Sequence, residues 1–244
     1  MSNLFNHLLL YTPFRKYYGF SRYYYSAKIR KKLRVYKDNL SLDNTIEYNL
    51  TALDHIQNDF SMRRMHFLIH GLLSLEFLSK DSKILVLGPR TENDLLILKG
   101  HGFKNVLGLD LITYSSLIQL GDMHNMPFED NSFDVVICGW TISYSKEPQV
   151  ACDEIDRVCK PGGVIAFGFD HLSQQNFNPN NEAPTQPDRI NSISDIKGMF
   201  AGKIQNSYFE YDADMKDLSK VEIQKKSGLE ASIVMFIFRT IRKI

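Results

Sequence analysis

The chain has 244 residues, of which 43% are hydrophobic and 23% charged, as in an ordinary globular protein with a substantial core. Three cysteines, Cys138, Cys152 and Cys159, are too few and too unevenly spaced for a disulfide framework or a zinc site, so we expect a reduced, cytoplasmic setting without a metal. No apolar stretch approaches the ~20 residues of a membrane span, and "LFNHLLLYTPF" is not followed by the small-residue cleavage site of a secretory signal.

The net charge of +1 is unevenly distributed along the chain. Residues 1–37 contain nine of the 29 basic residues and none of the 28 acidic residues, and they are rich in tyrosine. The remainder is therefore acidic. We expect a basic, aromatic extension over residues 1–50 and a main domain over residues 51–244.

Within the extension a helix is predicted between Tyr25 and Tyr36, because Ile29, Leu33 and Tyr36 fall on one stripe. Its aromatic side chains either pack on the main domain while its lysines face water, or residues 1–37 bind a polyanion. The polyanion is then a membrane surface of anionic lipid head groups, or an RNA whose bases stack on the tyrosines. Packing ranks first and the membrane-peripheral reading second. Nucleic acid ranks third because no RNA-binding motif accompanies the charge.

Beyond the extension the pattern is that of an α/β fold. Residues 61–78 have apolar residues at helical spacing and predict a buried helix. Strands are then predicted at 84–87, 106–109, 117–120, 133–138, 164–169, 207–211 and 232–239, with helices at 93–101 and 148–159. Apolar strands separated by helices indicate a mostly parallel sheet covered on both faces, with the last two strands antiparallel at one edge. Residues 171–191 predict a long surface loop, either a lid or a plain insertion.

Polar residues stand at the carboxyl ends of the predicted parallel strands, where ligands bind in open sheets. In chain order these residues are Gly88, Asp110, Asp122, Gly139 with Trp140, and Asp170 with His171. Asp110 lies 22 residues beyond Gly88, where an acid can accept hydrogen bonds from both ribose hydroxyls of a nucleoside cofactor. A solvated acid at a strand end is the alternative for Asp110.

Residues 82–169 resemble the class I S-adenosylmethionine-dependent methyltransferases, in particular the small-molecule, type 11-like group. The resemblance rests on "KILVLG", "VLGLD", "GDMHNMPFEDNSFDVVICGW" and "EIDRVCKPGGVIAFG", which follow one another in the family's order. It implies the Rossmann-like fold of that family, with a seven-stranded sheet, and S-adenosylmethionine as the cofactor.

By that resemblance Asp110 holds the ribose of the cofactor, Asp122 holds the adenine amino group, and Met123 lies on the adenine face. The same resemblance implies further cofactor contacts at Gly88, Pro89, Arg90, Leu111, Cys138 and Gly139.

The turn after the first parallel strand departs from the family. The family has acid-x-Gly-x-Gly-x-Gly where this chain has "VLGPRTE", so the acid and two of the three glycines are missing. Glycine there permits close backbone approach to the ligand, whereas Arg90 and Glu92 add bulk near the methionine part of the cofactor. Either Arg90 pairs with the carboxylate of the cofactor, or the pocket is filled and the cofactor lost. We favour pairing, because Asp110 and Asp122 are both retained.

The acceptor side has fewer candidates. A base assists methyl transfer to a hydroxyl, and His171 and His124 are the candidate catalytic residues, although each can also be a structural histidine. Trp140, Thr141 and Tyr144 follow the fourth strand and by the resemblance border the transferring methyl group. A core-capping role is an equal alternative for Trp140.

We therefore expect S-adenosylmethionine-dependent methyl transfer to a small-molecule or saccharide-like acceptor. The alternative is a catalytically inactive, methyltransferase-like binding or scaffold module whose Gly88-Pro89-Arg90 turn blocks the cofactor. An NAD-linked dehydrogenase is disfavoured because "GPRTEN" lacks the Gly-x-Gly-x-x-Gly spacing.

Overall fold

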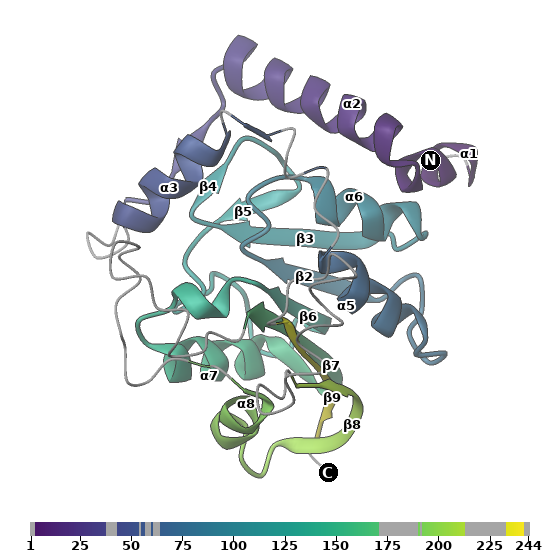
Figure 1. The fold of residues 1–244 in the computed structure, drawn as a ribbon, viewed down its shortest axis with the longest axis vertical. Coiled ribbons are helices and arrows are strands. Elements are labelled where there is room, and N and C mark those ends of the chain that lie inside the picture. The colour runs from purple at the N-terminus through teal and green to yellow at the C-terminus, as the bar shows by residue number, and fades with distance from the viewer. Residues whose placement is uncertain are drawn as a thin grey trace, which may run out of the picture.

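The computed structural model describes residues 3–37, 43–53, 55–56, 60, 64–170, 190, 192–212 and 233–241. Their centre is one seven-stranded sheet in the order β5-β3-β2-β6-β7-β9-β8 (Figure 1). The strands are β2 (Lys83–Leu87), β3 (Asn105–Asp110), β5 (Ile118–Leu120), β6 (Phe133–Gly139), β7 (Cys159–Asp170), β8 (Ile204–Tyr211) and β9 (Ile233–Thr240).

The direction of pairing confirms the α/β fold predicted from the sequence. Strands β5, β3, β2, β6 and β7 pair in parallel, β9 pairs antiparallel with β7, and β8 pairs antiparallel with β9. The parallel strands are apolar on both sides because helices cover both faces of the sheet. Their carboxyl ends therefore form one edge that is open to a ligand.

Alternate side chains of each central strand join different helices. In β2, Leu85 and Leu87 cluster with residues of α7 (Pro148–Val158) and α8 (Ile193–Met199), whereas Ile84 and Val86 cluster with residues of α5 (Arg64–Leu73) and α6 (Asn93–Gly100). The helix predicted over residues 61–78 is α5, which is shorter at its carboxyl end, and residues 61–63 lie outside the described part of the chain.

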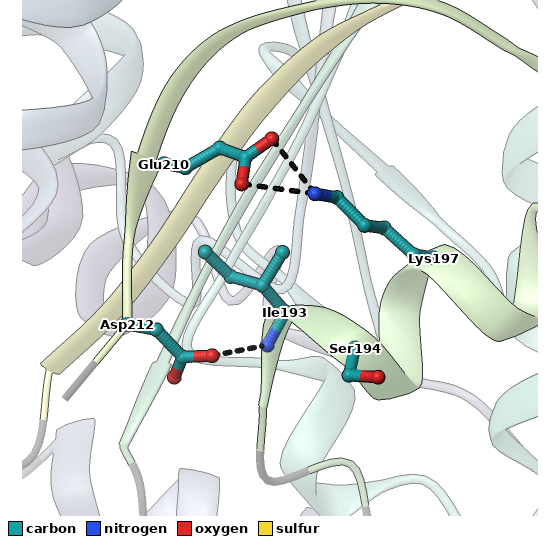
Figure 2. Close-up of a pocket in the computed structure, with 5 residues that line it drawn as sticks. All are labelled: Ile193, Ser194, Lys197, Glu210 and Asp212. Carbon is teal, nitrogen blue, oxygen red and sulfur yellow. Dashed lines mark hydrogen bonds and ion pairs between the residues drawn. The ribbon is translucent and has the colours of Figure 1, made fainter. Parts of the chain in front are cut away.

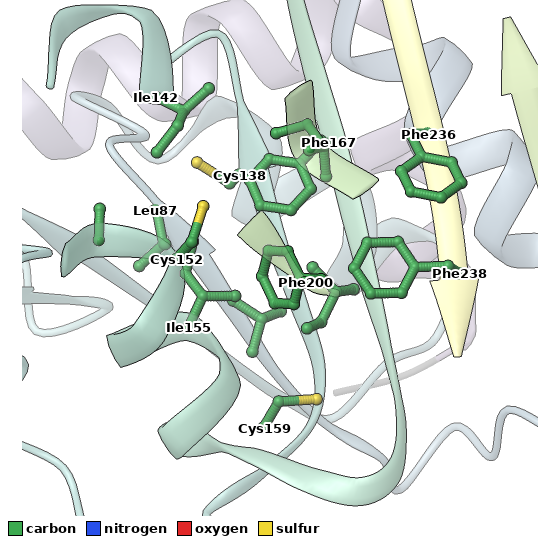
Figure 3. Close-up of a cluster of buried hydrophobic side chains, with 14 of the residues drawn as sticks. Leu87, Cys138, Ile142, Cys152, Ile155, Cys159, Phe167, Phe200, Phe236 and Phe238 are labelled. Atoms are coloured by element: carbon green, nitrogen blue, oxygen red, sulfur yellow. The ribbon is translucent and has the colours of Figure 1, made fainter. Parts of the chain in front are cut away.

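The three cysteines lie in the core on the α7 side of the sheet (Figure 3). They pack among aromatic side chains such as Phe167 and Phe238. Burial raises the pKa of all three thiols, so they are neutral and behave as small hydrophobic groups. The predicted cofactor contact Cys138 thus has its side chain inside the core.

The amino-terminal extension begins with two helices that lie along α6 (Figure 1). They are α1 (Asn3–Leu10) and α2 (Thr12–Tyr23), and the π-helix η1 (Tyr24–Ile29) continues α2. The helix predicted between Tyr25 and Tyr36 is wrong, because the helical run ends at Ile29. Lys31 has a φ of +50°, which is incompatible with a right-handed helix.

A short strand, β1 (Arg34–Val35), follows and pairs antiparallel with β4 (Ile112–Thr113). The backbone N–H of Tyr36 also donates to the carbonyl of Leu111 at 2.8 Å. Long-range backbone pairing therefore takes the place of the predicted helix. It attaches the extension to the loop that directly follows β3.

The extension and the main domain share a third hydrophobic cluster. Its buried members include Leu9 and Tyr23 from the extension and Leu96 and Tyr114 from the domain. Helix α3 (Asp43–Leu53) adds Ile46 and Leu53, which are also buried. Residues 3–37 are thus packed on the domain, while a domain boundary at residue 50 stays a prediction. Within the described residues we find no helix long and apolar enough to cross a membrane.

Candidate functional site

Asp110 and Asp122, the two acids that the sequence analysis assigns to the cofactor, lie at the ends of neighbouring strands. Asp110 closes β3, and its Cα partner in the parallel register is Leu120, the last residue of β5. Its carbonyl accepts a hydrogen bond from the N–H of Gly121 at 3.0 Å, and Asp122 follows. Both carboxylates are buried, with residue exposures of 4% and 6%. Sheet register therefore places two buried acids side by side at the ligand-binding edge.

The Asp110 carboxylate accepts hydrogen bonds from two backbone N–H groups. Oδ2 accepts from Arg90 at 2.7 Å, and Oδ1 accepts from Ile112 at 3.1 Å. Burial raises the pKa of Asp110 to about 6, although these hydrogen bonds oppose the rise. Asp110 therefore titrates just below neutral pH.

The turn between β2 and α6 keeps left-handed backbone conformations, although Gly88 is the one glycine left of the family's three. Gly88 has a φ of +62° and Arg90 a φ of +52°, both in the left-handed region. A Cβ at Gly88 would overlap the side chain of Thr141, whose Oγ1 donates to the carbonyl of Leu87 at 3.0 Å. Gly88 is therefore required by close packing, whereas Arg90 holds the same class of conformation at a steric cost.

Pro89 of the same turn is buried and packs on β3. A Cβ at Gly108 would lie only 2.8 Å from Cγ of Pro89. The ring therefore rests in the space that glycine leaves on the neighbouring strand. This contact fixes the turn against β3.

Glu92, at the family's third glycine position, is directed into the interface with the extension. Its carboxylate accepts two hydrogen bonds from Arg22 of α2, at 2.5 and 2.8 Å, and a third from the hydroxyl of Ser115. Its side chain is 1% exposed. The negative charge of Glu92 is thus satisfied by the extension, and hydrogen bonding to Glu92 raises the pKa of Arg22 further.

Arg90 is half-buried, and its side chain reaches α3. Its guanidinium carbon lies 5.9 Å from the ring centroid of Tyr48, within the range of a cation–π contact. Arg90 therefore has an aromatic neighbour from the extension. The turn contacts the extension through both Arg90 and Glu92.

Asp122, His124 and Ser145 form a chain of short hydrogen bonds. His124 Nδ1 lies 2.6 Å from Asp122 Oδ1, and His124 Nε2 lies 2.7 Å from Ser145 Oγ. The backbone N–H of His124 donates to the same Oδ1 at 3.0 Å. Burial acts to raise the pKa of Asp122, but the hydrogen bonds from His124 outweigh it and the pKa is lowered. An ionised Asp122 favours the proton on Nδ1 and leaves Nε2 to accept from Ser145.

A family model described as "Methyltransferase domain" matches residues 85–167, the segment that holds both acids and this histidine. This match covers about a third of the chain and is to a methyltransferase family. S-adenosylmethionine is the cofactor that this family implies.

Curated relatives match this chain over short stretches. The demethylmenaquinone methyltransferase of Staphylococcus haemolyticus is 51% identical over 45 residues, which are 18% of this chain and 19% of the relative. The enzyme of the same name from Desulfitobacterium hafniense is 43% identical over 54 residues, 21% of each chain. The chain thus matches about a fifth of the length of these relatives.

Solved structures share the fold at low identity. A putative methyltransferase of Haloferax volcanii, in a complex with the Trm112 methyltransferase activator, has a TM-score of 0.54 and 16% identity over 83% of this chain and 97% of its own. A putative sarcosine dimethylglycine methyltransferase of Galdieria sulphuraria has a TM-score of 0.53 and 18% identity over 77% and 89%. These likenesses concern the fold.

The residues present fit the adenosine half of this cofactor. Asp110 offers a carboxylate that would accept from ribose hydroxyls, and the hydrogen bonds from His124 all go to Oδ1 of Asp122, which leaves Oδ2 for another donor. At Gly139, a Cβ would overlap the sulfur of Met65, so the strand end is bare of side chain. Met123 is partly buried beside the core. In the altered turn, Arg90 supplies a positive charge that a carboxylate of the methionine half would match.

The remaining residues predicted from the sequence have other surroundings. Trp140 has a φ of +56° and is buried, and its indole Nε1–H donates to Asp170 at 2.8 Å. Tyr144 is 60% exposed. Leu111 packs on the cluster that joins the extension to the domain. His171 lies outside the described residues, so its role stays a prediction.

A separate hollow of about 460 Å³ lies between α8 and β8 (Figure 2). Lys197 and Glu210 form an ion pair across it at 2.9 Å, and Asp212 accepts from the backbone N–H of Ile193 at 3.1 Å. It shares no residue with the strand-end site. We assign it no role in methyl transfer.

Sequence reasoning missed three contributors to the site: Ser145, Arg22 and Tyr48. Ser145 lies 21 residues beyond His124, and no local spacing links the two. Arg22 and Glu92 lie 70 residues apart. One signal in the sequence indicates the pair of Arg22 and Glu92. It is a carboxylate at a glycine position of the family, in a chain that has a strongly basic extension.

Proposed function

We propose that the protein transfers the methyl group of S-adenosylmethionine to a small-molecule or saccharide-like acceptor. The main observation in support of this proposal is the register of β3 and β5, which brings Asp110 near Asp122 at the ligand-binding edge. Two buried acids at neighbouring strand ends offer acceptors for an adenosine, one for its ribose and one for its adenine. The family match over residues 85–167 supports this assignment.

In this proposal the chain mainly binds and aligns the cofactor. Asp110 accepts from the ribose hydroxyls, Asp122 Oδ2 accepts from the adenine amino group, and Met123 lies against the adenine ring. Arg90 pairs with the carboxylate of the methionine part. The cofactor supplies a methyl group activated by its sulfonium, and the protein supplies proximity and alignment.

The hydrogen-bond chain of Asp122, His124 and Ser145 supplies a base for a hydroxyl acceptor. Ser145 Oγ donates to His124 Nε2, so the Ser145 hydroxyl can receive the proton of the acceptor while its own proton passes to Nε2. Asp122 holds the opposite ring nitrogen protonated and stabilises the imidazolium. His171 remains a second candidate for this role.

Calorimetry with S-adenosylhomocysteine tests the binding site. Wild-type protein should bind, whereas Asp110→Ala and Asp122→Ala should weaken binding at least tenfold by removing charge-assisted hydrogen bonds. Asp134→Ala is the matched control. Asp134 lies at the start of β6, at the opposite end of the sheet from the site, and pairs with Lys160. No heat from the wild type at millimolar ligand would contradict the proposal.

One observation favours a second candidate, a non-catalytic methyltransferase-like module. Asp110 is only 4% exposed and already binds the N–H of Arg90, so a ribose reaches it only if its cover moves. In such a module, wild type would not bind S-adenosylhomocysteine, and the Arg90→Gly, Glu92→Gly double variant would gain affinity. Binding by the wild type would exclude it.

The acceptor is open to direct assay once binding is shown. The matched relatives are named for demethylmenaquinone, which makes it one acceptor to test beside saccharides. Radiolabelled methyl from the cofactor would be followed into each acceptor. Transfer that disappears in His124→Gln but persists in His70→Gln would assign the reaction to this site.

A further inference from the structure

Large aromatic and aliphatic side chains remain exposed on the extension, although its other side is buried. Tyr17, Tyr24, Tyr25, Ile29 and Leu33 are between 36% and 75% exposed. Surface tyrosines are ordinary one at a time, but here five apolar or amphipathic groups occur within 17 residues. Such a concentration indicates a contact surface.

The same stretch is densely cationic. Its exposed basic residues are Lys28, Arg30, Lys31, Lys32 and Arg34, and residues 1–37 contain no acidic residue. Lys28 and Arg30 each lie 5.9 Å from a tyrosine ring, above Tyr23 and Tyr25. Arg30 thus lies beside an exposed ring, while Lys28 lies over the ring of the buried Tyr23.

Helical geometry separates this surface from the face that binds the domain. Arg15, Gly19, Tyr23 and Ala27 recur every four residues and are buried against the domain. Tyr17 lies on the opposite side of α2, and Tyr24 and Lys28 of η1 are exposed. Figure 1 places α2 at the rim of the molecule, with no described element beyond it. We call Tyr17, Tyr24, Tyr25 and residues 28–34 the basic-aromatic face.

We propose that the basic-aromatic face docks on a bilayer surface that contains anionic lipids. Tyrosine rings lie at the head-group level, aliphatic side chains enter the acyl boundary, and lysines and arginines attract anionic head groups. Ile29 and Leu33 favour lipid over RNA, because aliphatic side chains add apolar burial in a bilayer but do not stack on bases.

The face also adjoins the strand-end site. Arg34 belongs to β1, which pairs with β4 immediately after Asp110. Docking therefore holds the ligand-binding edge of the sheet close to the membrane. The inference stands on the extension alone and does not depend on which acceptor is methylated.

Vesicle co-sedimentation of the full chain tests the proposal. Deleting residues 1–37 is unsuitable because their inner side is part of the hydrophobic packing. Instead, Lys28→Gln, Lys31→Gln and Lys32→Gln are combined. The matched control combines Lys80→Gln, Lys83→Gln and Lys104→Gln, three exposed lysines at the opposite end of the sheet. Vesicles are pure phosphatidylcholine or contain phosphatidylserine, at low and at high salt.

We expect binding to phosphatidylserine vesicles at low salt that weakens at high salt. Three neutralised cations should reduce the partition coefficient about a hundredfold, at about fivefold per cation. The control triple should retain wild-type binding. A Tyr24→Trp reporter should shift its emission to the blue with these vesicles, against a buried Trp140 that contributes a constant signal.

Three results would overturn the proposal. The first is no sedimentation of the wild type with phosphatidylserine vesicles at low salt. The second is equal loss in both triple variants, which would mean attraction by overall charge. The third is binding of a single-stranded RNA through the face without any binding to vesicles, which would make RNA the partner.

Discussion

Arg22 of the extension donates two hydrogen bonds to Glu92, the residue that stands at the third glycine position of the family's cofactor turn. The Glu92 side chain is 1% exposed and that of Arg22 36% exposed. Glu92 in place of glycine puts a buried negative charge at the turn, and Arg22, 70 residues earlier in the chain, neutralises that charge. The turn and the extension form one structural unit.

The first prediction concerns this ion pair. Arg22→Ala leaves the Glu92 carboxylate buried without its cation and should lower the free energy of unfolding by about 2 kcal/mol. The double variant Arg22→Ala, Glu92→Gly removes both charges and should be more stable than Arg22→Ala alone. Urea denaturation measures both. Arg30→Ala, on the exposed side of the extension, serves as the control and should change stability by less than about 0.5 kcal/mol. An Arg22→Ala variant as stable as this control would refute the coupling.

The second prediction concerns the left-handed backbone at Arg90. Arg90→Gly and Arg90→Ala both lose the contact with Tyr48, but only alanine pays the steric cost of a φ of +52°. The glycine variant should therefore be more stable than the alanine variant by about 1 kcal/mol. At Lys99, inside α6, the order should reverse, since glycine weakens a helix. Equal stability of the two Arg90 variants would show that the turn relaxes out of this conformation.

The third prediction is a pH dependence of cofactor binding. With a pKa of about 6, Asp110 is mostly protonated at pH 5 and mostly ionised at pH 7. A carboxylate accepts ribose hydroxyls better than a carboxylic acid does, so affinity for S-adenosylhomocysteine should fall about tenfold from pH 7 to pH 5. Calorimetry across this range in matched buffers measures the slope. Flat affinity between pH 5 and pH 7 would exclude an ionised Asp110 from binding.

The same shift makes a stability prediction of opposite sign. The folded pKa of Asp110 lies above its ordinary value of 3.8, so the folded protein binds more protons between those values than the unfolded chain does. The contribution of Asp110 to stability is thus present below about pH 4 and lost as pH rises to about 6. Comparing unfolding of wild type and Asp110→Ala over this interval isolates it. A difference that grows in favour of the wild type as pH rises would contradict this sign.

The fourth prediction concerns the base. His124→Gln should lower kcat by about 10²- to 10⁴-fold on a hydroxyl acceptor, while cofactor affinity changes far less. Ser145→Ala should lower kcat more mildly and alter its pH profile, because the proton path through Oγ is lost. His70→Gln, an exposed histidine of α5, controls for general effects. Full activity in His124→Gln would leave His171 as the candidate base.

The sheet could be predicted from the sequence because its signals are local. Apolar strands, intervening helices and strand-end residues recur within short stretches, and parallel strands bring their carboxyl ends to one edge. Asp110 and Asp122 are neighbours for this reason. The helix predicted between Tyr25 and Tyr36 failed because an apolar stripe does not reveal a competing long-range pairing. In the structure, β1 pairs with β4, a partner more than 70 residues away.

The altered turn could be located from the sequence, but the partners of its side chains could not be predicted. The loss of two glycines indicated bulk at Arg90 and Glu92. That the Glu92 carboxylate is bound by Arg22 depends on how α2 lies along α6, which no local pattern contains. Likewise, the spacing of Asp122 and His124 indicates a contact, whereas the partnership with Ser145 appears only when the loop after β6 is placed.

The most direct test is a crystal structure of the protein with S-adenosylhomocysteine. The account predicts the ribose hydroxyls within hydrogen-bond distance of Asp110, the adenine amino group at Asp122 and the guanidinium of Arg90 at the methionine carboxylate. An adenosyl group bound elsewhere, or these three side chains unmoved and the ligand missing at saturating concentration, would contradict it.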